Sequence, residues 1–183
     1  MTKKLTIIIL LITQFAFFQN AGYADSATSA EYKIKALYLY NFTKFIKWNE
    51  DDKSKETFQI SIVGPDPFGT TLEDSYRNKK IINLSISIAR YKNTENLKKV
   101  SLIFISKELS KEDIIKVLNF AKENQIITVS DFPDFIELGG IIGFVKIKEK
   151  IKFEINSIAC YATNKTISSK ILRLARRIIK LDK

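Results

Sequence analysis

Catalytic chemistry in this chain has to use carboxylates, lysine, tyrosine, serine or threonine, because its 183 residues include no histidine and a single cysteine. Nucleophile systems built on Ser-His-Asp or Cys-His are therefore excluded, and so are zinc sites that need imidazole. The only plausible carboxylate set for a hydrolase is Asp66, Asp131 and Glu154. This composition favours binding over catalysis, and it predicts no cofactor and no metal site.

The loop Gly64–Gly69 is the first candidate site. It follows an apolar strand, Phe58–Val63, and its two prolines and two glycines prevent a strand or helix from continuing through it. A polar helical segment over residues 71–78 comes next, so the stretch opens a βα unit. Ligands of open α/β sheets bind at such carboxyl-end loops. The letters G-P-D-P-F-G lack the G-x-G-x-x-G spacing of a dinucleotide fingerprint.

Two further predicted strands, Val100–Ile105 and Gln125–Val129, also end in polar residues. Since parallel strands present their carboxyl ends on one edge of a sheet, we expect the three loops to meet there. The candidate ligand- or partner-binding residues at that edge are Asp66, Phe68, Ser106, Ser130, Asp131 and Phe132. Exposed rings beside polar strand ends are typical of a contact surface, and Phe135 adds a third ring. The alternative is structural: Asp66 caps the next helix or braces its turn, and the rings fold back into the core.

Three other features have competing interpretations. Glu154 lies either on the wet side of an alternating strand or paired with Lys152 or Lys146. Cys160 is a small buried residue or, as a second interpretation, a bridge to another chain. A final helix from about Thr166 to Lys180 would present basic residues either to solvent or to anionic polymer or lipid. Those basic residues are Lys170, Arg173, Arg177 and Lys180.

The first helix begins at Glu31, where aromatic and aliphatic residues start to recur at three- and four-residue steps. The predicted buried stripe is Ile34, Leu37, Tyr38, Asn41, Phe45 and Trp48, widened by Tyr32, Tyr40, Phe42 and Ile46. Three lysines, Lys35, Lys44 and Lys47, mark its predicted wet edge. An aromatic-rich helix is either a ligand box or part of the core, and core packing is the favoured interpretation.

Strands and helices alternate along the rest of the chain. Residues 81–91 alternate as a half-buried strand near an edge, and Ser110 with Asp113 forms a capping-box analogue before the next helix. Residues 141–147 and 151–155 read as a hairpin with a charged tip. We therefore predict a single three-layer α/β/α sandwich over residues 25–183, with a mostly parallel sheet and a late antiparallel hairpin.

The N-terminus has the layout of a secretory signal peptide over residues 1–24. Lys3 and Lys4 precede an apolar run from Leu5 to Phe18, and small residues lead to a predicted cut after Ala24. The alternative is a membrane anchor, but the run is shorter than the ~20 residues that span a bilayer. The full chain has a formal net charge of +10, which falls to +8 when Lys3 and Lys4 are removed with the signal peptide. An exported chain this basic suits anionic lipid, cell-wall polymer or an acidic partner, and not nucleic acid.

Seven blocks in order resemble the YfiR family, also called the domain-of-unknown-function 4154 family, from about Glu31 to Arg176. The blocks are EYKIKALYLYNFTKFIKW, IVGPDPFG, LIFIS, ITVSDFPDF, GGIIGFV, KIKFEIN and ISSKILRLAR. The resemblance implies an exported, non-enzymatic sensor. The best-known member is a disulfide-dependent dimer that holds an inner-membrane diguanylate cyclase inactive from the periplasm. Here Ser101 stands where members often carry cysteine and Cys160 is alone, so redox control by an internal bridge does not transfer.

Three functions follow from these observations. The first is a periplasmic protein, with a homodimer as one form, that restrains a membrane-bound signalling partner such as a diguanylate cyclase. The second is a solute- or wall-fragment-binding domain without an enzyme partner. The third, a carboxylate hydrolase, is disfavoured by the absence of histidine and of any nucleophile motif.

Overall fold

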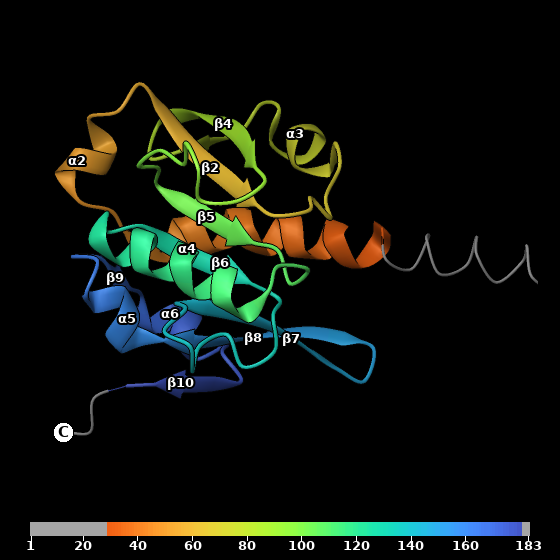
Figure 1. Cartoon of the computed structure of the whole chain (residues 1–183). Helices are drawn as coiled ribbons and strands as arrows, with labels where there is room; N and C mark the ends of the chain where they lie inside the picture. The colour runs from red at the N-terminus through yellow and green to blue at the C-terminus, as the bar shows by residue number, and fades with distance from the viewer. Residues whose placement is uncertain (1–28, 181–183) are drawn as a thin grey trace, which may run out of the picture.

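An eight-stranded sheet organises the computed structural model, which describes residues 29–180 (Figure 1). Its strand order is β10-β8-β7-β6-β5-β2-β4-β3. The strands are β2 (Thr57–Val63), β3 (Lys80–Ile81), β4 (Leu84–Tyr91), β5 (Leu102–Ile105), β6 (Ile127–Ser130), β7 (Ile142–Ile147), β8 (Lys150–Asn156) and β10 (Arg177–Ile179). Neighbours pair in parallel except in the β3–β4 and β7–β8 hairpins. The predicted, mostly parallel sheet with a late hairpin is confirmed.

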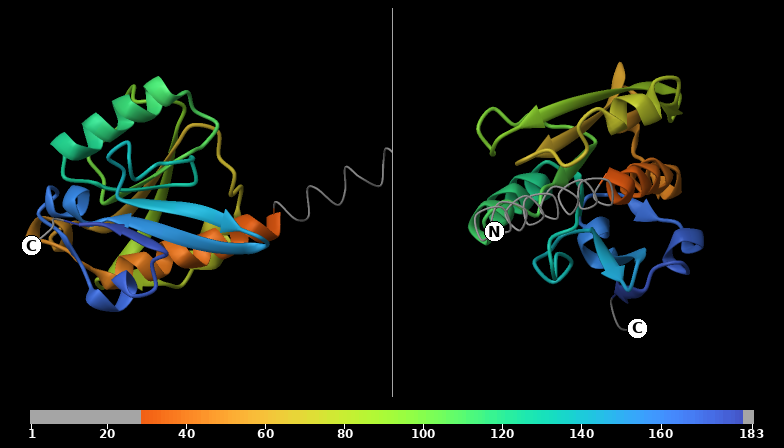
Figure 2. Two further views of the ribbon diagram at one scale, coloured as in Figure 1. Left: turned by 90° about the horizontal axis from the view of Figure 1, so that it is seen from below. Right: turned by 90° about the vertical axis from the view of Figure 1, so that its right-hand side faces the viewer.

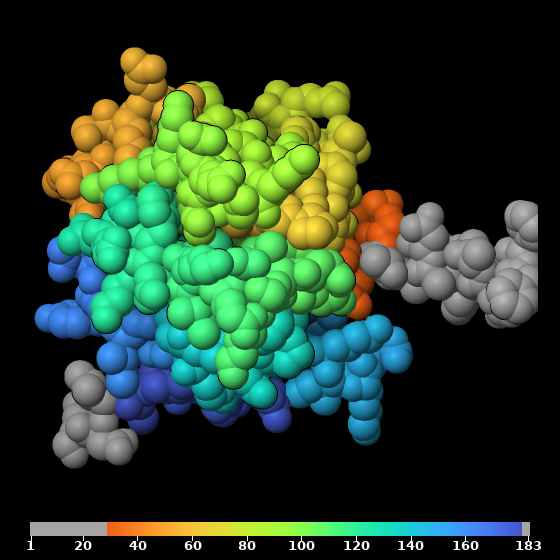
Figure 3. Space-filling view, viewed as in Figure 1, coloured from red at the N-terminus to blue at the C-terminus, as the bar shows by residue number. Residues whose placement is uncertain are grey.

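Helices cover both faces of this sheet. The first helix, residues 29–45, lies on one face with α3 (Thr71–Tyr76), and α4 (Lys111–Glu123) lies on the other (Figure 2). Two clusters of buried side chains fill the two interfaces. The sheet curls around the first helix, and α4 covers the middle of the opposite face (Figure 3). The three-layer prediction is therefore confirmed.

The first helix buries only part of the predicted stripe: Tyr32 and Phe42 are buried as predicted, as are Ile46 and Trp48 beyond its end. Ile34 and Leu37 are 46% and 50% exposed, whereas Lys35 is buried. The helix packs through Ala36 and Leu39, because a small residue at the contact lets it approach the curled sheet closely. The helix also ends at residue 45, so Trp48 is not on it but follows β1 (Ile46–Lys47).

A tight turn divides the segment predicted as one strand over residues 81–91. Ile82 and Asn83 both have positive φ, 45° and 69°, which is the conformation of a two-residue type I′ hairpin. Asn tolerates this region, but a β-branched isoleucine there is strained. The turn folds β3 back antiparallel along the first residues of β4, and the predicted position near the sheet edge is confirmed.

The predicted final helix over residues 166–180 is wrong. The chain instead forms β9 (Thr166–Ile167), which pairs with β1, then the one-turn α6 (Ser169–Leu172), then β10. The short helix α5 (Ser157–Tyr161) precedes β9 in the chain. Residues 177–179 form a strand instead of a helix because they pair with the open side of β8. This pairing begins where Arg176 N–H donates to the carbonyl of Phe153 at 2.8 Å.

The remaining short helix, α2 (Glu50–Lys53), connects β1 to β2. Among the described residues, we find no helix with the length and apolar character needed to cross a bilayer. The predicted signal peptide lies outside the described residues.

Candidate functional site

The loops that follow β2, β5 and β6 lie on neighbouring strands at one edge of the sheet, as expected. The crevice between the first two loops is filled by protein. A Cβ atom added to Gly64 would lie 2.7 Å from Leu109 Cγ and 2.9 Å from Ser106 Cβ, so glycine is needed there for close packing. Its φ of +95° also favours glycine. A ligand at this edge therefore has to bind beyond the β2–β5 crevice.

Asp66 braces its own loop. One carboxylate oxygen accepts the N–H of Phe68 at 2.7 Å, and the other accepts Arg90 Nε at 2.6 Å. Arg90 also bonds to Glu73 and to the carbonyl of Gly69. The structural interpretation of Asp66 thus accounts for both oxygens.

Phe68 and Phe135 are buried, at 3% and 2% exposure, so the expectation of exposed rings is wrong for both. The Phe68 ring meets Tyr32 and Phe104 edge to face, with centroids 5.2 and 4.8 Å away. Phe132 is half-buried against the α4 side of the core. Aromatic rings at a sheet edge close the core against water, and this burial outweighs their placement in loops.

The two serines of the candidate set serve the backbone. Ser130 Oγ donates to the carbonyl of Ile105 at 2.7 Å and accepts the N–H of Phe132 at 3.0 Å. Ser106 Oγ accepts the N–H of Glu108 at 3.3 Å. Both hydroxyls therefore shape the loops that follow their strands.

Asp131 is the candidate that the structure places in a polar cluster. Its Oδ2 accepts hydrogen bonds from the Tyr32 hydroxyl and from Lys35 Nζ, each at 2.6 Å. Lys35 Nζ also donates to Glu31 at 2.6 Å, and Glu31 lies 3.5 Å from Lys146 Nζ. The cluster joins the first helix to the loop after β6 and to the β7–β8 hairpin.

The environment of this cluster shifts the pKa values of Tyr32 and Glu31 away from the neutral range. Burial, followed by the hydrogen bond to Asp131 and its charge, raises the pKa of Tyr32 well above its ordinary value. Burial would raise the pKa of Glu31, but the hydrogen bond and charge of Lys35 outweigh it and lower that pKa. The phenol of Tyr32 therefore stays protonated as a hydrogen-bond donor to Asp131, and Tyr32 is not poised as a base or nucleophile.

A cavity of about 190 Å³ lies beside the cluster. Its lining includes Glu31, Lys35, Lys107, Asp131, Phe144 and Lys146. Asp131 Oδ1 is buried and has no donor among the described residues. A buried acceptor without a donor is costly, so this oxygen suits a small ligand or water that donates a hydrogen bond.

Tyr32 and Lys35 were not predicted as site residues. The available signal was a lysine three residues after a tyrosine inside an apolar helix, where both lie on one face. By itself, the spacing of the lysines predicts a solvent-exposed edge of the helix. Only their pairing with an aspartate about one hundred positions later reveals their role.

The carboxylates proposed for a hydrolase are not assembled. Asp66 belongs to the β2 side of the sheet and is held by Arg90, while Glu154 lies on β8. Glu154 is buried and pairs with Arg176 and with Arg177, the latter at 2.7 Å. The solvated position is therefore wrong, and the partners are these arginines instead of Lys152 or Lys146. Burial acts to raise the pKa of Glu154, but the two arginines lower it overall.

The basic face predicted for the final helix is lost with the helix. Arg177 is bound to Glu154 and Glu137. Cys160 is buried as a small core residue, which confirms that interpretation. Within residues 29–180, no group of three His, Cys, Asp or Glu side chains is placed to hold a metal ion.

Comparison with known proteins gives one family. The model of the YfiR/HmsC-like family matches residues 32–176, and no curated protein matches the chain. Among solved structures, a conserved domain protein from Vibrio cholerae O1 biovar El Tor is similar at 11% identity with a TM-score of 0.45. That similarity covers 70% of this chain, which spans 57% of the Vibrio chain. The family match covers most of the chain and every strand of the large sheet except β10. The chain therefore belongs to the YfiR/HmsC-like family.

Proposed function

We propose that this protein is an exported, non-enzymatic regulator that binds and restrains a membrane-bound signalling enzyme such as a diguanylate cyclase. The observation that carries the proposal is the family match over residues 32–176, because the family is known for periplasmic regulators of diguanylate cyclases. The family is regulatory rather than catalytic. In this proposal residues 1–24 are a cleaved signal peptide and residues 25–183 form one domain.

The side-chain geometry supports a binding role. Asp66, Asp131 and Glu154 each have cationic partners of their own and are not grouped around a shared cavity. General acid–base catalysis needs a titrating group within reach of a bound substrate. These three carboxylates instead form ion pairs between separate elements of the fold. Such ion pairs can couple partner binding at one element to a change in another.

Deletion and complementation test the proposed function. Loss of the gene should raise cellular cyclic-di-GMP, measured by mass spectrometry, and expression of the full chain should restore the lower level. The matched control is the chain without residues 1–24, which should accumulate in the cytoplasm and leave cyclic-di-GMP high. Unchanged cyclic-di-GMP in the deletion strain would contradict the proposal.

Partner capture gives a second, direct readout. Cross-linking in intact cells, followed by purification from the envelope, should recover a membrane protein with a cyclase domain. The same purification identifies the mature N-terminus, which should be Asp25. Recovery of an intact Met1 chain from the cytoplasm would contradict export.

A small-solute-binding role is the second candidate, and the cavity beside Asp131 is the observation that favours it. A ligand there would donate a hydrogen bond to Asp131 Oδ1. Thermal shift with a panel of small amines and amides, compared between the wild type and Asp131→Asn, tests this role. A ligand that stabilises both proteins equally does not use Asp131.

A further inference from the structure

The outer edge of β4 is open over most of its length. On one side β4 pairs with β2 from Ser85 to Tyr91, but on the other side it pairs with β3 at only two positions, Leu84 and Ser85. Before β3 the chain turns away towards α3, so the described residues leave the strand from Ile86 onward without a neighbour. An unpaired strand edge is a template for another strand.

The backbone groups that face this edge can be assigned from the ladder. The carbonyl of Tyr91 accepts the N–H of Gly64, which follows β2, at 2.8 Å, so Tyr91 faces β2. Because alternate residues of a strand direct their N–H and C=O groups to opposite sides, Ser87 and Ala89 also face β2. The N–H and C=O groups of Ile86, Ile88 and Arg90 therefore face outward.

Up to Ala89, the β4 edge lacks the features that normally protect an edge strand; Arg90 is charged, but its guanidinium is bound to Asp66 and Glu73. Leu84–Ala89 contains neither a charged residue nor a proline. The opposite edge of the sheet, β10, is three residues long and is flanked or occupied by Arg176, Arg177 and Lys180. Lysine, arginine and short length are the devices by which sheets avoid unwanted pairing. One edge of this sheet is thus blocked, and the other is left able to pair.

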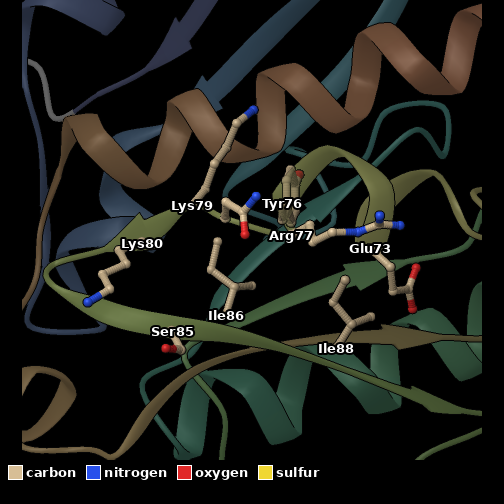
Figure 4. A pocket seen from close by; sticks show the side chains of 9 residues that line it. Glu73, Tyr76, Arg77, Lys79, Lys80, Ser85, Ile86 and Ile88 are labelled. Carbon is tan, nitrogen blue, oxygen red and sulfur yellow. The ribbon is translucent and has the colours of Figure 1, made fainter.

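A groove of about 550 Å³ runs beside the open edge, between β4 and the segment that leads from α3 (Figure 4). Ile86 and Ile88 form its apolar floor, and Arg77, Lys79 and Lys80 lie along its rim. Its one acidic lining residue, Glu73, is already paired with Arg90. Among the described residues, no carboxylate forms an ion pair with Lys79 or Lys80, and Lys79 Nζ lies 4.7 Å from the centre of the Tyr40 ring on the first helix.

The basic residues at the rim of the groove determine which kind of strand it can bind. An incoming strand places alternate side chains over Ile86 and Ile88, which favours apolar residues, and its other positions near the rim favour acidic residues. A second copy of this chain is disfavoured, because pairing through β4 would bring the basic rims of two strongly basic molecules together. The basic rim and the free backbone groups thus both favour an extended segment of another protein that contains acidic residues.

We propose that β4 binds an extended acidic segment of another protein, which adds as a ninth strand along Ile86–Arg90. Main-chain hydrogen bonds to Ile86, Ile88 and Arg90 supply affinity, and Lys79 and Lys80 select acidic residues. The identification of that protein with the restrained membrane enzyme rests on the proposed function, while strand addition itself does not.

Amide hydrogen exchange tests the edge directly. The probes are two synthetic peptides of about seven residues, the length of an ordinary strand, which alternate valine with either glutamate or lysine. In the free protein, the amides of Ile86, Ile88 and Arg90 should exchange much faster than those of Ser87 and Ala89. The glutamate peptide should slow the three fast amides about tenfold or more, and the lysine peptide should not.

Three results would overturn the inference. The first is slow exchange of the three amides in a dilute monomer, which would mean that the edge is covered. The second is equal or absent protection by the two peptides. The third is a wild-type dimer in which these amides become exposed only on dissociation, since the occupant would then be a second copy.

Charge reversal at the rim provides the variant test without disturbing the core. Lys79→Glu with Lys80→Glu should keep the wild-type melting temperature and should lose the preference for the glutamate peptide. The matched control is Lys47→Glu with Lys44→Glu, which changes two exposed lysines on the first helix and β1. Equal peptide preference in the wild type and the rim variant would contradict the proposed selectivity.

The two proposals fail separately. If the glutamate peptide binds but deletion of the gene leaves cyclic-di-GMP unchanged, the proposed function fails and the edge inference stands. If the wild type restrains the cyclase and the peptide gives no protection, only the edge inference fails.

Discussion

Lys35 and Asp131 form a buried ion pair, with Nζ and Oδ2 2.6 Å apart and both side chains at most 5% exposed. The pair crosses from the first helix to the end of β6. Removal of one partner from a buried pair leaves the other charge without compensation, which is far more damaging than replacement of both. This contact therefore controls how the first helix sits on the sheet edge.

Lys35→Met should lower the free energy of unfolding by about 3–5 kcal/mol, because Asp131 and Glu31 lose their shared ammonium. Chemical denaturation measures the change. Lys33→Met on the same helix is the control, since Lys33 is exposed and its loss should cost no more than about 0.5 kcal/mol. Equal stability of the two variants would show that the buried pair contributes nothing.

Phe68→Ala should destabilise the protein by about 3–5 kcal/mol, because it leaves a cavity between Tyr32 and Phe104. A thermal or denaturant melt checks it. Tyr161→Ala is the control, since that ring is 74% exposed. A Phe68 variant that melts like the wild type but loses partner binding would restore the contact-surface interpretation of Phe68.

Acid should weaken the fold through Glu154. Its folded pKa lies below the ordinary value of 4.5, so its contribution to stability is present above pH 4.5 and is lost as the pH falls through the folded pKa. Glu154→Gln should therefore flatten the pH dependence of unfolding below pH 4.5. Glu123→Gln, an exposed change on α4, should leave that dependence unchanged. The same pH slope in both variants would contradict the assignment.

Cys160 should be inert in the native protein. Burial is the main cause that raises the pKa of its thiol, to about 12, with an opposing effect of Lys165. Since only the thiolate reacts, alkylation near neutral pH should be slow until denaturant is added. Reductant should not change the melting temperature, because a single cysteine cannot form an internal bridge. Rapid native labelling, or a melting temperature that falls on reduction, would show an accessible thiol or a bridge between chains.

The alternation of strands and helices could be predicted from local sequence. Prolines and glycines end β2 where they stand, the run Val100–Ile105 is apolar enough for a central strand, and Ser110 Oγ accepts the N–H of Asp113 as its position indicated. These features act within a few residues, so a linear pattern contains the physical cause. The lack of histidine likewise limited the chemistry before any fold was known.

Contacts between distant segments decided the rest. An apolar helix offers more than one possible buried stripe, and the curled sheet selected the one that contains Lys35, whose partner lies 96 positions away. The basic C-terminal segment has a helical period, but the open side of β8 and the buried charge of Glu154 made it a strand. Burial of the Phe68 and Phe135 rings depends on core side chains that are distant in sequence. The open edge of β4 depends on how few residues of β3 pair with it. Local pattern therefore determined most of the elements, whereas long-range packing and charge pairing determined the C-terminal strand and which faces are buried or remain free to bind.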